Sequence, residues 1–502
     1  MNRIHQILDR WQGEHGSAAA IITHDGRTIS YAELADAVDQ ATSVLRDHGV
    51  QGGDRIMILA ENSLSTIAFF HAASSLDAWA IPANARMTLP EIQRVLDHAR
   101  PRAVVCTTDV SEQAVKTAKE LGAKTIQAAF GEVAVAAPYE SAPEPVDPTA
   151  EQVAVLMYTT GTTGAPKGVM MSHANVLFTS KVSSHTRGIG PADTVYLALP
   201  MSHVFGLVST MCATLFAGGT LKLECKFSAE ALYQALDMGV TVLPAVPQMH
   251  AHLMKYARDR GVTRIEGSKL RYVSSGAAPL DPTWKREAEA FFGLPLQNGY
   301  GMTETTAGIC MTRSDIGDPD VSVGVPFPGV EVHLANSENT DGVGEILVRG
   351  GNVMKGYYKL PDLTNAAFND EGWFHTGDLG RFDDAGRLHI AGRSKEMIIR
   401  SGFNIFPIEV EAALNDHPDV VQSAVVGRKV EGANEEVLAF VQVVKGAKVT
   451  PDDLKAHAAS VLTAYKRPSI IILTETLPAA ATGKILKHKL IETFHKELAE
   501  TG

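Results

Sequence analysis

The chain has 502 residues, of which 45% are hydrophobic and 20% are charged. This composition is typical of a globular protein, and it excludes an intrinsically disordered chain, which would be poor in apolar residues. The formal net charge of −12 argues against a surface devoted to nucleic acid or anionic membrane. We therefore expect roughly two to four domains, at about 150 residues each, and no nucleic-acid partner.

The cysteines and the N-terminus indicate where the protein resides. The chain has 4 cysteines without CxxC spacing, and its first residues lack the apolar core of a signal peptide. These features predict a reduced, cytoplasmic protein. The uncharged stretch 194–221 is long enough to cross a bilayer. Its proline, glycines and hydroxyl residues instead favour a buried strand, loop and helix, so we expect no transmembrane segment.

The first part of the chain alternates helical and strand patterns. Ser30 and Glu33 form a capping box ahead of a helical pattern. The runs 55–60 and 103–106 are predicted to be short buried strands. Helices are predicted over 88–99 and 111–121. This alternation is typical of a parallel sheet covered by helices.

The pattern changes twice further along the chain. A proline-rich connection at 138–148 precedes a predicted strand at 152–158. From about residue 329 to 390, glycine turns separate short strands, which predicts a β-rich subdomain. After Arg393 the chain reads as a small α+β domain. The expected fold class is therefore α/β. A large N-terminal domain (1–394) has parallel sheets covered by helices plus the β-rich subdomain, and a small mobile α+β C-terminal domain (395–502) follows.

A loop rich in threonine and glycine follows the strand predicted at 152–158. It reads Tyr158-Thr-Thr-Gly-Thr-Thr-Gly-Ala-Pro-Lys167-Gly168. Glycines let backbone N–H groups face an anion, and lysine adds a point charge suited to phosphate. The spacing is not that of a Walker A loop, in which four residues separate the glycines. A flexible surface turn is the alternative, but four threonines and a lysine directly after a buried strand favour a phosphate site.

Three further charged residues lie in short polar motifs. Glu304 follows a Gly-Met-Thr turn, and Mg²⁺ commonly takes one or two carboxylates together with phosphate oxygens. Asp378, in the sequence His-Thr-Gly-Asp, can accept both hydroxyls of a ribose. Arg393 offers a planar fork to ribose or phosphate oxygens. The alternatives are a solvated loop carboxylate, a turn aspartate and a surface salt bridge, respectively.

The threonine-rich loop resembles the phosphate-binding signature of the adenylate-forming superfamily, which contains acyl-CoA synthetases, the adenylation domains of peptide synthetases, and luciferases. Further segments resemble its other motifs in the family's order, and the resemblance covers nearly the whole chain. They are 300–304 for adenine and metal, 344–358 in the β-rich subdomain, 373–378 for ribose, 392–396 at the domain junction and 478–484 for the catalytic lysine.

The resemblance implies a role for each motif. It places Mg²⁺ on Glu304 and Thr159, and it names Lys484 and His203 as catalytic, with no acid–base role assigned to His203. ATP would be bound by Thr159, Thr160, Gly161, Thr162, Thr163, Gly164, Lys167, Gly276, Ala277, Ala278, Asn298, Gly299, Tyr300, Gly301, Met302, Thr303, Asp378, Arg393 and Lys484. The acyl pocket would contain His203, Phe205, Ser209, Gly276, Gly299 and Met302, and the CoA channel Arg400, Ser401, Gly402 and Phe403.

Two of these segments also have a plain structural interpretation. A histidine in an apolar run, as His203 is, usually belongs to a core, whereas the resemblance implies a wall of the carboxylate pocket. The small residues at 274–279 would admit a flat ring or an acyl group, but they also suit a tight turn between a strand and a helix. The residues by themselves leave both alternatives open.

Lys484 directly follows Thr482 and Gly483, ahead of the terminal helix. A lysine beside Mg²⁺ would stabilise the charge that develops on the α-phosphate oxygens in the transition state. Alternatively, Lys484 belongs to a solvated basic face with the lysines that follow it. In the family, the C-terminal domain rotates about a hinge that Lys395 matches, where many relatives have aspartate. One pose brings in Lys484, and the other presents the CoA channel.

The implied reaction has two steps. A carboxylate attacks the α-phosphate of MgATP to give an acyl-adenylate and pyrophosphate, and the thiol of coenzyme A then forms the thioester and releases AMP. We expect no carrier domain after residue 502, and this expectation favours coenzyme A as the acceptor. A free-standing adenylation enzyme that loads a carrier protein is the main alternative. A luciferase-like oxygenase and a catalytically inactive binding protein are more distant ones.

The candidate pocket residues indicate a substrate class. None of the acyl-pocket residues is lysine or arginine, which favours a monocarboxylate. Either an aryl-propenoate or related aromatic acid, or a medium- or long-chain fatty acid, fits the small residues. The expected partners are this acid, ATP and coenzyme A, in a cytoplasmic enzyme that is a monomer or a homodimer.

Overall fold

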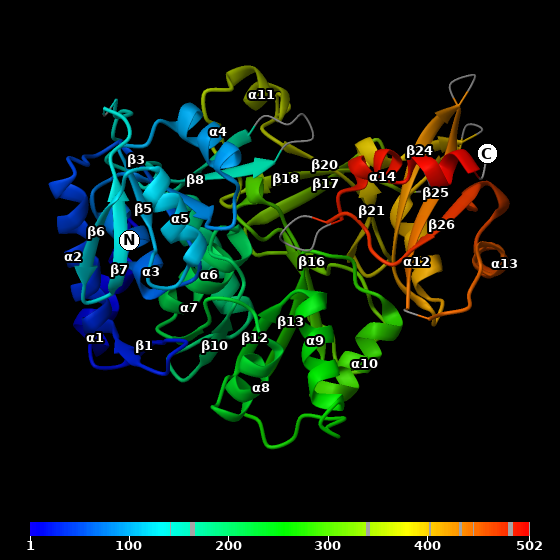
Figure 1. The fold of residues 1–502 in the computed structure, drawn as a ribbon, viewed down its shortest axis with the longest axis horizontal. Helices are drawn as coiled ribbons and strands as arrows, with labels where there is room; N and C mark the ends of the chain where they lie inside the picture. The colour runs from blue at the N-terminus through cyan, green and yellow to red at the C-terminus, as the bar shows by residue number, and fades with distance from the viewer. Residues whose placement is uncertain are drawn as a thin grey trace. The chain divides into compact units, whose positions relative to one another are not determined.

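The computed structural model describes residues 1–140, 142–160, 166–337, 342–400, 403–430, 434–444, 446–479 and 485–500. The chain forms two compact units (Figure 1). The N-terminal unit comprises Met1–Leu280, Trp284–Val332 and Val348–Phe374, and the C-terminal unit comprises Asp281–Thr283, His333–Leu347 and His375–Gly502. The sequence predicts a domain boundary between residues 394 and 395, after which the C-terminal domain is expected to be mobile. This boundary stays a prediction.

The first sheet of the N-terminal unit has nine strands in the order β16-β15-β14-β13-β12-β10-β11-β1-β2. The strands from β14 to β1 run parallel, and the edge strands β15, β16 and β2 pair antiparallel. The bounds are β1 (Ala19–Ile22), β2 (Thr28–Ser30), β10 (Thr194–Leu197), β11 (Thr220–Leu223), β12 (Val242–Ala245), β13 (Tyr272–Gly276), β14 (Leu296–Tyr300), β15 (Cys310–Met311) and β16 (Val325–Pro326).

The second sheet has eight strands in the order β19-β9-β8-β4-β3-β5-β7-β6. Its centre, from β8 to β5, is parallel, and its remaining pairs are antiparallel. The bounds are β3 (Arg55–Ala60), β4 (Trp79–Asn84), β5 (Ala103–Cys106), β6 (Lys124–Ala128), β7 (Gly131–Ala136), β8 (Val153–Thr160), β9 (Pro166–Ser172) and β19 (Gly356–Tyr357).

Helices flank both sheets of this unit (Figure 1). They are α1 (Gln6–His15), α2 (Tyr31–Asp47), α3 (Leu64–Ser75), α4 (Leu89–Ala99), α5 (Glu112–Glu120), α6 (His173–Thr186), α7 (Ala213–Phe216), α8 (Ala229–Asp237), α9 (Pro247–Arg258), α10 (Pro282–Phe292) and α11 (Pro361–Ala366), with a π-helix at Phe205–Cys212.

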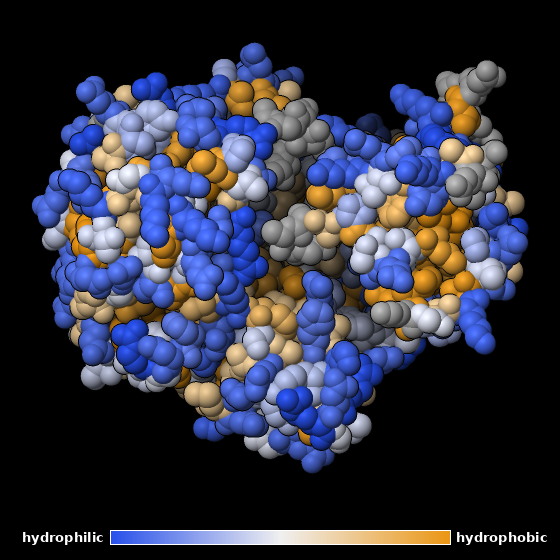
Figure 2. All heavy atoms as spheres, viewed as in Figure 1, coloured by the Kyte–Doolittle hydropathy of each residue, from blue (hydrophilic) through white to orange (hydrophobic). Residues whose placement is uncertain are grey.

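The central strands of the second sheet, such as β3 and β5, are buried on both faces because they are apolar. In β3, Ile56 and Ile58 belong to the larger core, while Met57 and Leu59 belong to a second core. Successive side chains of a strand point to opposite faces, so the run RIMILA fills both. The face of the N-terminal unit that Figure 2 shows is mainly hydrophilic.

The C-terminal unit contains a three-stranded sheet in the order β24-β25-β26 and a hairpin of β22 and β23. Alternate residues of β25 again supply two cores. The exposed apolar residues of this unit include Val421 and Val461, and orange surface is visible on the unit in Figure 2. The bounds are β22 (Ile398–Arg400), β23 (Phe403–Ile405), β24 (Val420–Val430), β25 (Asn434–Val443), β26 (Ile470–Thr474), α12 (Pro407–Asn415), α13 (Pro451–Val461), α14 (Lys487–Thr493) and α15 (His495–Glu500).

A four-stranded sheet, in the order β17-β18-β20-β21, forms the β-rich subdomain. Its strands are β17 (Val330–Ala335), β18 (Gly344–Gly350), β20 (Phe374–Phe382) and β21 (Leu388–Arg393). The expected α/β fold class, with a large N-terminal part and a smaller C-terminal one, is confirmed. The uncharged stretch 194–221 forms β10, the π-helix, α7 and β11. No described helix has the length and apolar character needed to cross a membrane.

Candidate active site

The two ends of the threonine-rich loop are held by β8 and β9. The antiparallel register pairs Thr159 with Lys167, so the lysine of the motif lies opposite its first threonine. Lys167 is half-buried at the start of β9. Gly161, Thr162, Thr163 and Gly164, together with the side chain of Thr160, lie outside the described part of the chain.

Tyr357 brings the phosphate motif and the metal motif together. Its hydroxyl donates to Oε1 of Glu304 at 3.0 Å, and Nζ of Lys167 lies over its ring, 5.6 Å from the centroid. Burial raises the pKa of the Tyr357 phenol, and the Glu304 carboxylate raises it further. The phenol therefore stays protonated and keeps donating. Three segments far apart in the sequence thus place a cation, a donor and a carboxylate at one point.

Glu304 is held in place by its backbone and by the turn that precedes it. Its carbonyl accepts the N–H of Met354 at 2.8 Å, and Thr303–Thr305 form one 3₁₀ turn after β14. A Cβ on Gly301 would lie 1.5 Å from the carbonyl oxygen of Ala307, so only glycine fits there. This close approach turns the chain sharply and fixes the direction of the carboxylate.

The other members of the adenine motif lie along the ends of two neighbouring parallel strands. Gly276 on β13 pairs with Gly299 on β14. The side chain of Asn298 is buried and donates to the carbonyl of Ser322 at 2.9 Å, so it supports the fold. Ala277 and Ala278 are exposed just after β13. Tyr300, the last residue of β14, is half-buried, as are Met302 and Thr303 beyond it.

The expected acyl residues are also neighbours. A Cβ on Gly276 would lie 3.2 Å from the ring of Phe205, so this ring covers the end of β13. A Cβ on Gly299 would instead face Cys310 and Met311. His203 is exposed in the turn before the π-helix. This placement does not match the core position that a histidine in an apolar run suggests.

Ser209, the remaining acyl residue, is buried on the π-helix and contacts an arginine that sequence reasoning missed. Arg187, the residue that ends α6, donates to the Ser209 carbonyl, and its Nη2 donates to the Ser209 hydroxyl at 2.8 Å. The Arg187 residue is 3% exposed. Nothing in the local pattern marks it, because it lies outside every motif.

The ribose motif forms an ion pair within the C-terminal unit. Asp378 and Arg393 are register partners on β20 and β21, and Nε of Arg393 lies 3.2 Å from Oδ1 of Asp378. Thr376 positions this aspartate by accepting its N–H at 3.0 Å. The salt-bridge interpretation of Arg393 is therefore realised, and its partner is the other residue of the expected ribose site.

The hinge and CoA-channel residues lie close together in sequence in the same unit. Lys395 is exposed in a 3₁₀ turn after β21. The guanidinium of Arg400 donates to the carbonyl of Arg467 at 2.9 Å, and the exposed ring of Phe403 stacks on Tyr465 with centroids 4.5 Å apart. Ser401, Gly402 and the catalytic-lysine residue Lys484 lie outside the described residues.

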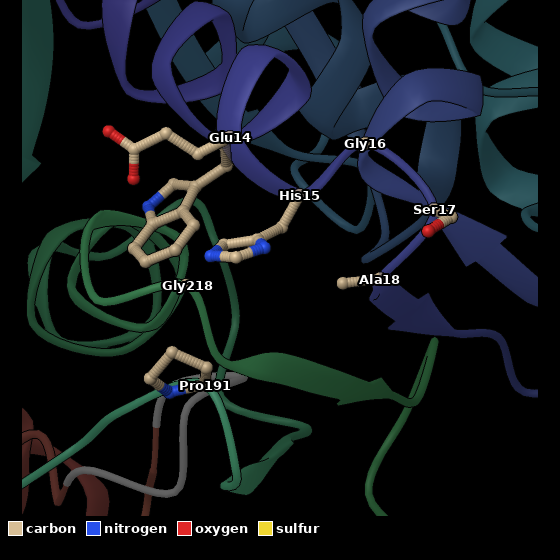
Figure 3. Close-up of a pocket in the computed structure, with 8 residues that line it drawn as sticks. Glu14, His15, Gly16, Ser17, Ala18, Pro191 and Gly218 are labelled. Atoms are coloured by element: carbon tan, nitrogen blue, oxygen red, sulfur yellow. The ribbon is translucent and has the colours of Figure 1, made fainter.

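A preformed metal cage is absent from the described ranges, where no group of three or more His, Cys, Asp or Glu side chains could hold an ion. A hollow of about 390 Å³ lies instead beside Trp11, His15 and Pro191 (Figure 3). It contains none of the motif residues. The chemistry indicated by the motifs therefore depends on Glu304 and on oxygens that a substrate brings.

Comparison with known proteins identifies the family. Residues 8–358 match the model of AMP-binding enzymes, and residues 409–484 match the model of their C-terminal domain. The chain belongs to the AMP-binding enzyme family. It is 32% identical to a sulfoacetate–CoA ligase of Cupriavidus necator over 93% of this chain and 92% of that protein. It is also 31% identical to a feruloyl-CoA synthase of Amycolatopsis, over 95% of this chain and 96% of that protein.

A solved structure agrees with these matches. ATP-bound MatB from Rhodopseudomonas palustris is 31% identical, covers 98% of this chain with 99% of its own, and superposes with a TM-score of 0.85. The expectations of an adenylate-forming enzyme and of an AMP-forming acyl-CoA synthetase are confirmed. The residue roles stay predictions.

Proposed function

We propose that Lys167, Tyr357 and Glu304 form the MgATP site of this AMP-forming carboxylic acid–CoA ligase. The observation that carries the proposal is the contact of Tyr357 with both Lys167 and Glu304. A lysine neutralises phosphate oxygens as a point charge. The phenol holds the carboxylate in one orientation, and a fixed carboxylate avoids reorganisation during the reaction.

The described residues fit a metal that arrives with the nucleotide. One carboxylate without a cluster of further ligands suits Mg²⁺, which keeps several waters and binds substrate phosphates. When bound, Mg²⁺ would offset negative charge on the phosphates. Thr159, opposite Lys167 on β8, is the second residue proposed to face it.

The remaining assignments complete the proposed enzyme. Asp378 and Arg393, paired at 3.2 Å, are proposed for the ribose, with Lys484 for the α-phosphate and Lys395 for the hinge. Phe205, Gly276 and Gly299 are proposed to line the acyl pocket, where the ring of Phe205 meets the end of β13. We propose a cytoplasmic enzyme, since the sequence favours a reduced compartment.

The chemical class of the substrate acid depends on which residues line the acyl pocket. The monocarboxylate prediction rested on the lack of a cation in the candidate pocket. Arg187 beside Ser209 removes that premise. Among the relatives, one is named for ferulate and another for sulfoacetate, so family membership is compatible with either a neutral or an anionic remainder of the acid.

Pyrophosphate release from MgATP with a panel of carboxylic acids tests the proposal, followed by thioester formation with CoA alone. Glu304→Gln should lower the adenylation rate by about 10²–10³-fold, the cost of losing one preorganised charge-stabilising group. Glu331→Gln is the matched control, because Glu331 is exposed and paired with Arg349. Equal activity of the wild type and Glu304→Gln would contradict the site. Release of pyrophosphate without CoA transfer would favour the carrier-protein alternative.

A further inference from the structure

Arg187 is a buried cation whose partners are all neutral. Its guanidinium donates to the carbonyl and the hydroxyl of Ser209, and the phenol of Tyr272 lies near enough to influence its pKa. Its Nε has no hydrogen-bond partner, and no ion pair of the described residues includes Arg187. Arginine remains protonated inside proteins, although burial lowers the pKa of this guanidinium. A desolvated charge without an opposite charge is costly.

The nearby carboxylate is already engaged. Asp193 contacts Nη2 of Arg271 at 2.7 Å, and it also accepts from the hydroxyl of Thr241 at 2.7 Å and from the N–H of Gly190. Arg271 is the exposed neighbour of the pair, with 40% of its side chain accessible. The ion pair in this region therefore belongs to the surface arginine and leaves the buried one with neutral partners.

Arg187 lies along the strand that leads to the proposed acyl pocket. Tyr272, Ser274 and Gly276 alternate along β13, and alternate residues share one face of a strand. Gly276 is covered by Phe205 at the carboxyl end, while Tyr272 contacts Arg187 further back. Phe205 and Ser209 belong to the same π-helix. Residues of β13 and of the π-helix therefore lie near both the proposed acyl pocket and the guanidinium.

We infer that Arg187 recognises a second anionic group of the substrate, at the end opposite the reacting carboxylate. At about 3.3 Å per residue, the two steps from Gly276 to Ser274 span roughly 7 Å, and the four steps from Gly276 to Tyr272 span roughly 13 Å. The fitting acid is a linear dicarboxylate of medium length or an aryl-propenoate with a distal acidic group. A planar guanidinium binds a carboxylate in bidentate fashion. This inference rests on the proposed acyl pocket.

The experiment compares acids that differ only in the distal charge. The probes are 4-carboxycinnamate and its distal amide, 4-carbamoylcinnamate, and the linear diacids from succinate to sebacate with their monoamides. Wild-type pyrophosphate release should favour the charged member of the best pair by at least tenfold in kcat/KM. Arg187→Met should abolish this preference through KM for the charged acid, with kcat/KM for the amide changed less than threefold. Arg187→Lys should retain part of the preference.

A purely structural arginine predicts a different result. Arg187 would then only tie α6 to the π-helix, and Arg187→Met would lower the rates with both members of a pair in parallel. That outcome overturns the inference, and so does a wild-type enzyme that uses the amides as well as the charged acids at every length. The wild-type comparison holds even if Arg187→Met folds poorly. The control Arg271→Met should leave the preference unchanged.

The failure of the inference is distinct from the failure of the proposed function. Good activity with uncharged acids and no preference for a distal anion overturns the role of Arg187 while the ligase assignment stands. No pyrophosphate release with any acid would overturn both.

Discussion

A half-buried lysine in the C-terminal unit and a buried arginine in the N-terminal unit have opposite surroundings. In the C-terminal unit, Nζ of Lys487 lies 2.8 Å from a Glu411 oxygen and 3.1 Å from a Glu396 oxygen. Burial alone would lower the pKa of Lys487, but the two carboxylates raise it above its ordinary value. In the N-terminal unit, the hydrogen-bond partners of Arg187 are the carbonyl and the hydroxyl of Ser209.

This difference in partners distinguishes Lys487, whose charge is balanced by carboxylates of the fold, from Arg187, whose charge would be balanced by a ligand. Lys487 joins α12 and the turn after β21 through Glu411 and Glu396, so its charge is balanced within the fold. Arg187 gains hydrogen bonds but no opposite charge. Buried ion pairs are costly to break because a lone charge remains, whereas removing an already lone charge relieves a penalty.

The largest expected effect tests whether Lys484, in the C-terminal part of the chain, contributes its charge to acyl-adenylate formation. Lys484→Ala should lower acyl-adenylate formation by about 10²–10³-fold, because one preorganised group at the α-phosphate is lost. Thioester formation from a supplied acyl-adenylate should change far less. Measuring both half-reactions on one preparation separates the steps, and equal losses would contradict the two-pose interpretation.

The second prediction contrasts the two units under acid. Burial lowers the pKa of His250 to about 4, that of His71 to about 4 and that of His173 to about 3, and all three belong to the N-terminal unit. Each stays neutral in the folded state while the unfolded chain binds a proton near pH 6.5. Their contribution to stability is therefore full above pH 6.5 and is lost as the pH falls toward 4.

For His250 the loss is on the order of 3 kcal/mol at about 1.4 kcal/mol per pKa unit. The melting temperature of the N-terminal unit should fall steeply between pH 6.5 and 4. His250→Gln should flatten this dependence, because the amide can still donate to the Ser274 carbonyl, which His250 meets at 3.0 Å. His252→Gln, exposed on the same helix, is the control. Identical pH profiles for the two variants would contradict the prediction.

The third prediction tests the comparison directly. Lys487→Met should destabilise the C-terminal unit by about 2 kcal/mol, since two carboxylates lose their shared cation. Arg187→Met should change the stability of the N-terminal unit by less than about 1 kcal/mol, because the lost hydrogen bonds offset the relieved charge. Calorimetric melting of both variants checks the order. A larger loss for Arg187→Met would reverse the comparison.

The smallest expected effect concerns the hydroxyl of Tyr357, a neutral donor to Glu304 in the N-terminal unit. Tyr357→Phe keeps the ring beneath Lys167 and removes the hydroxyl that orients Glu304. We expect about a tenfold loss in kcat/KM for adenylation, which corresponds to one hydrogen bond to a charged group, with an unchanged melting temperature. Tyr358→Phe, whose hydroxyl donates to Glu144 at 2.6 Å, should retain the full rate.

Much of the local structure was predictable because its causes are local. The strand at 55–60 has the bounds that its apolar run predicts, and the capping box of Ser30 and Glu33 forms as expected. The contact between Tyr357 and Glu304 was not predictable, since it joins residues 53 positions apart. The pairing of Asp378 with Arg393 required the register of β20 and β21.

The sequence by itself determined the family, the fold class and the order of the motifs. Hydrophobic periodicity and turn residues act over a few positions, and the motif residues are contiguous. Tertiary structure alone decided which charges meet. It placed Tyr357 between Lys167 and Glu304, and it buried Arg187 against Ser209. The energy of a charge depends on its burial and on the partners that distant segments bring to it, and no local pattern encodes either.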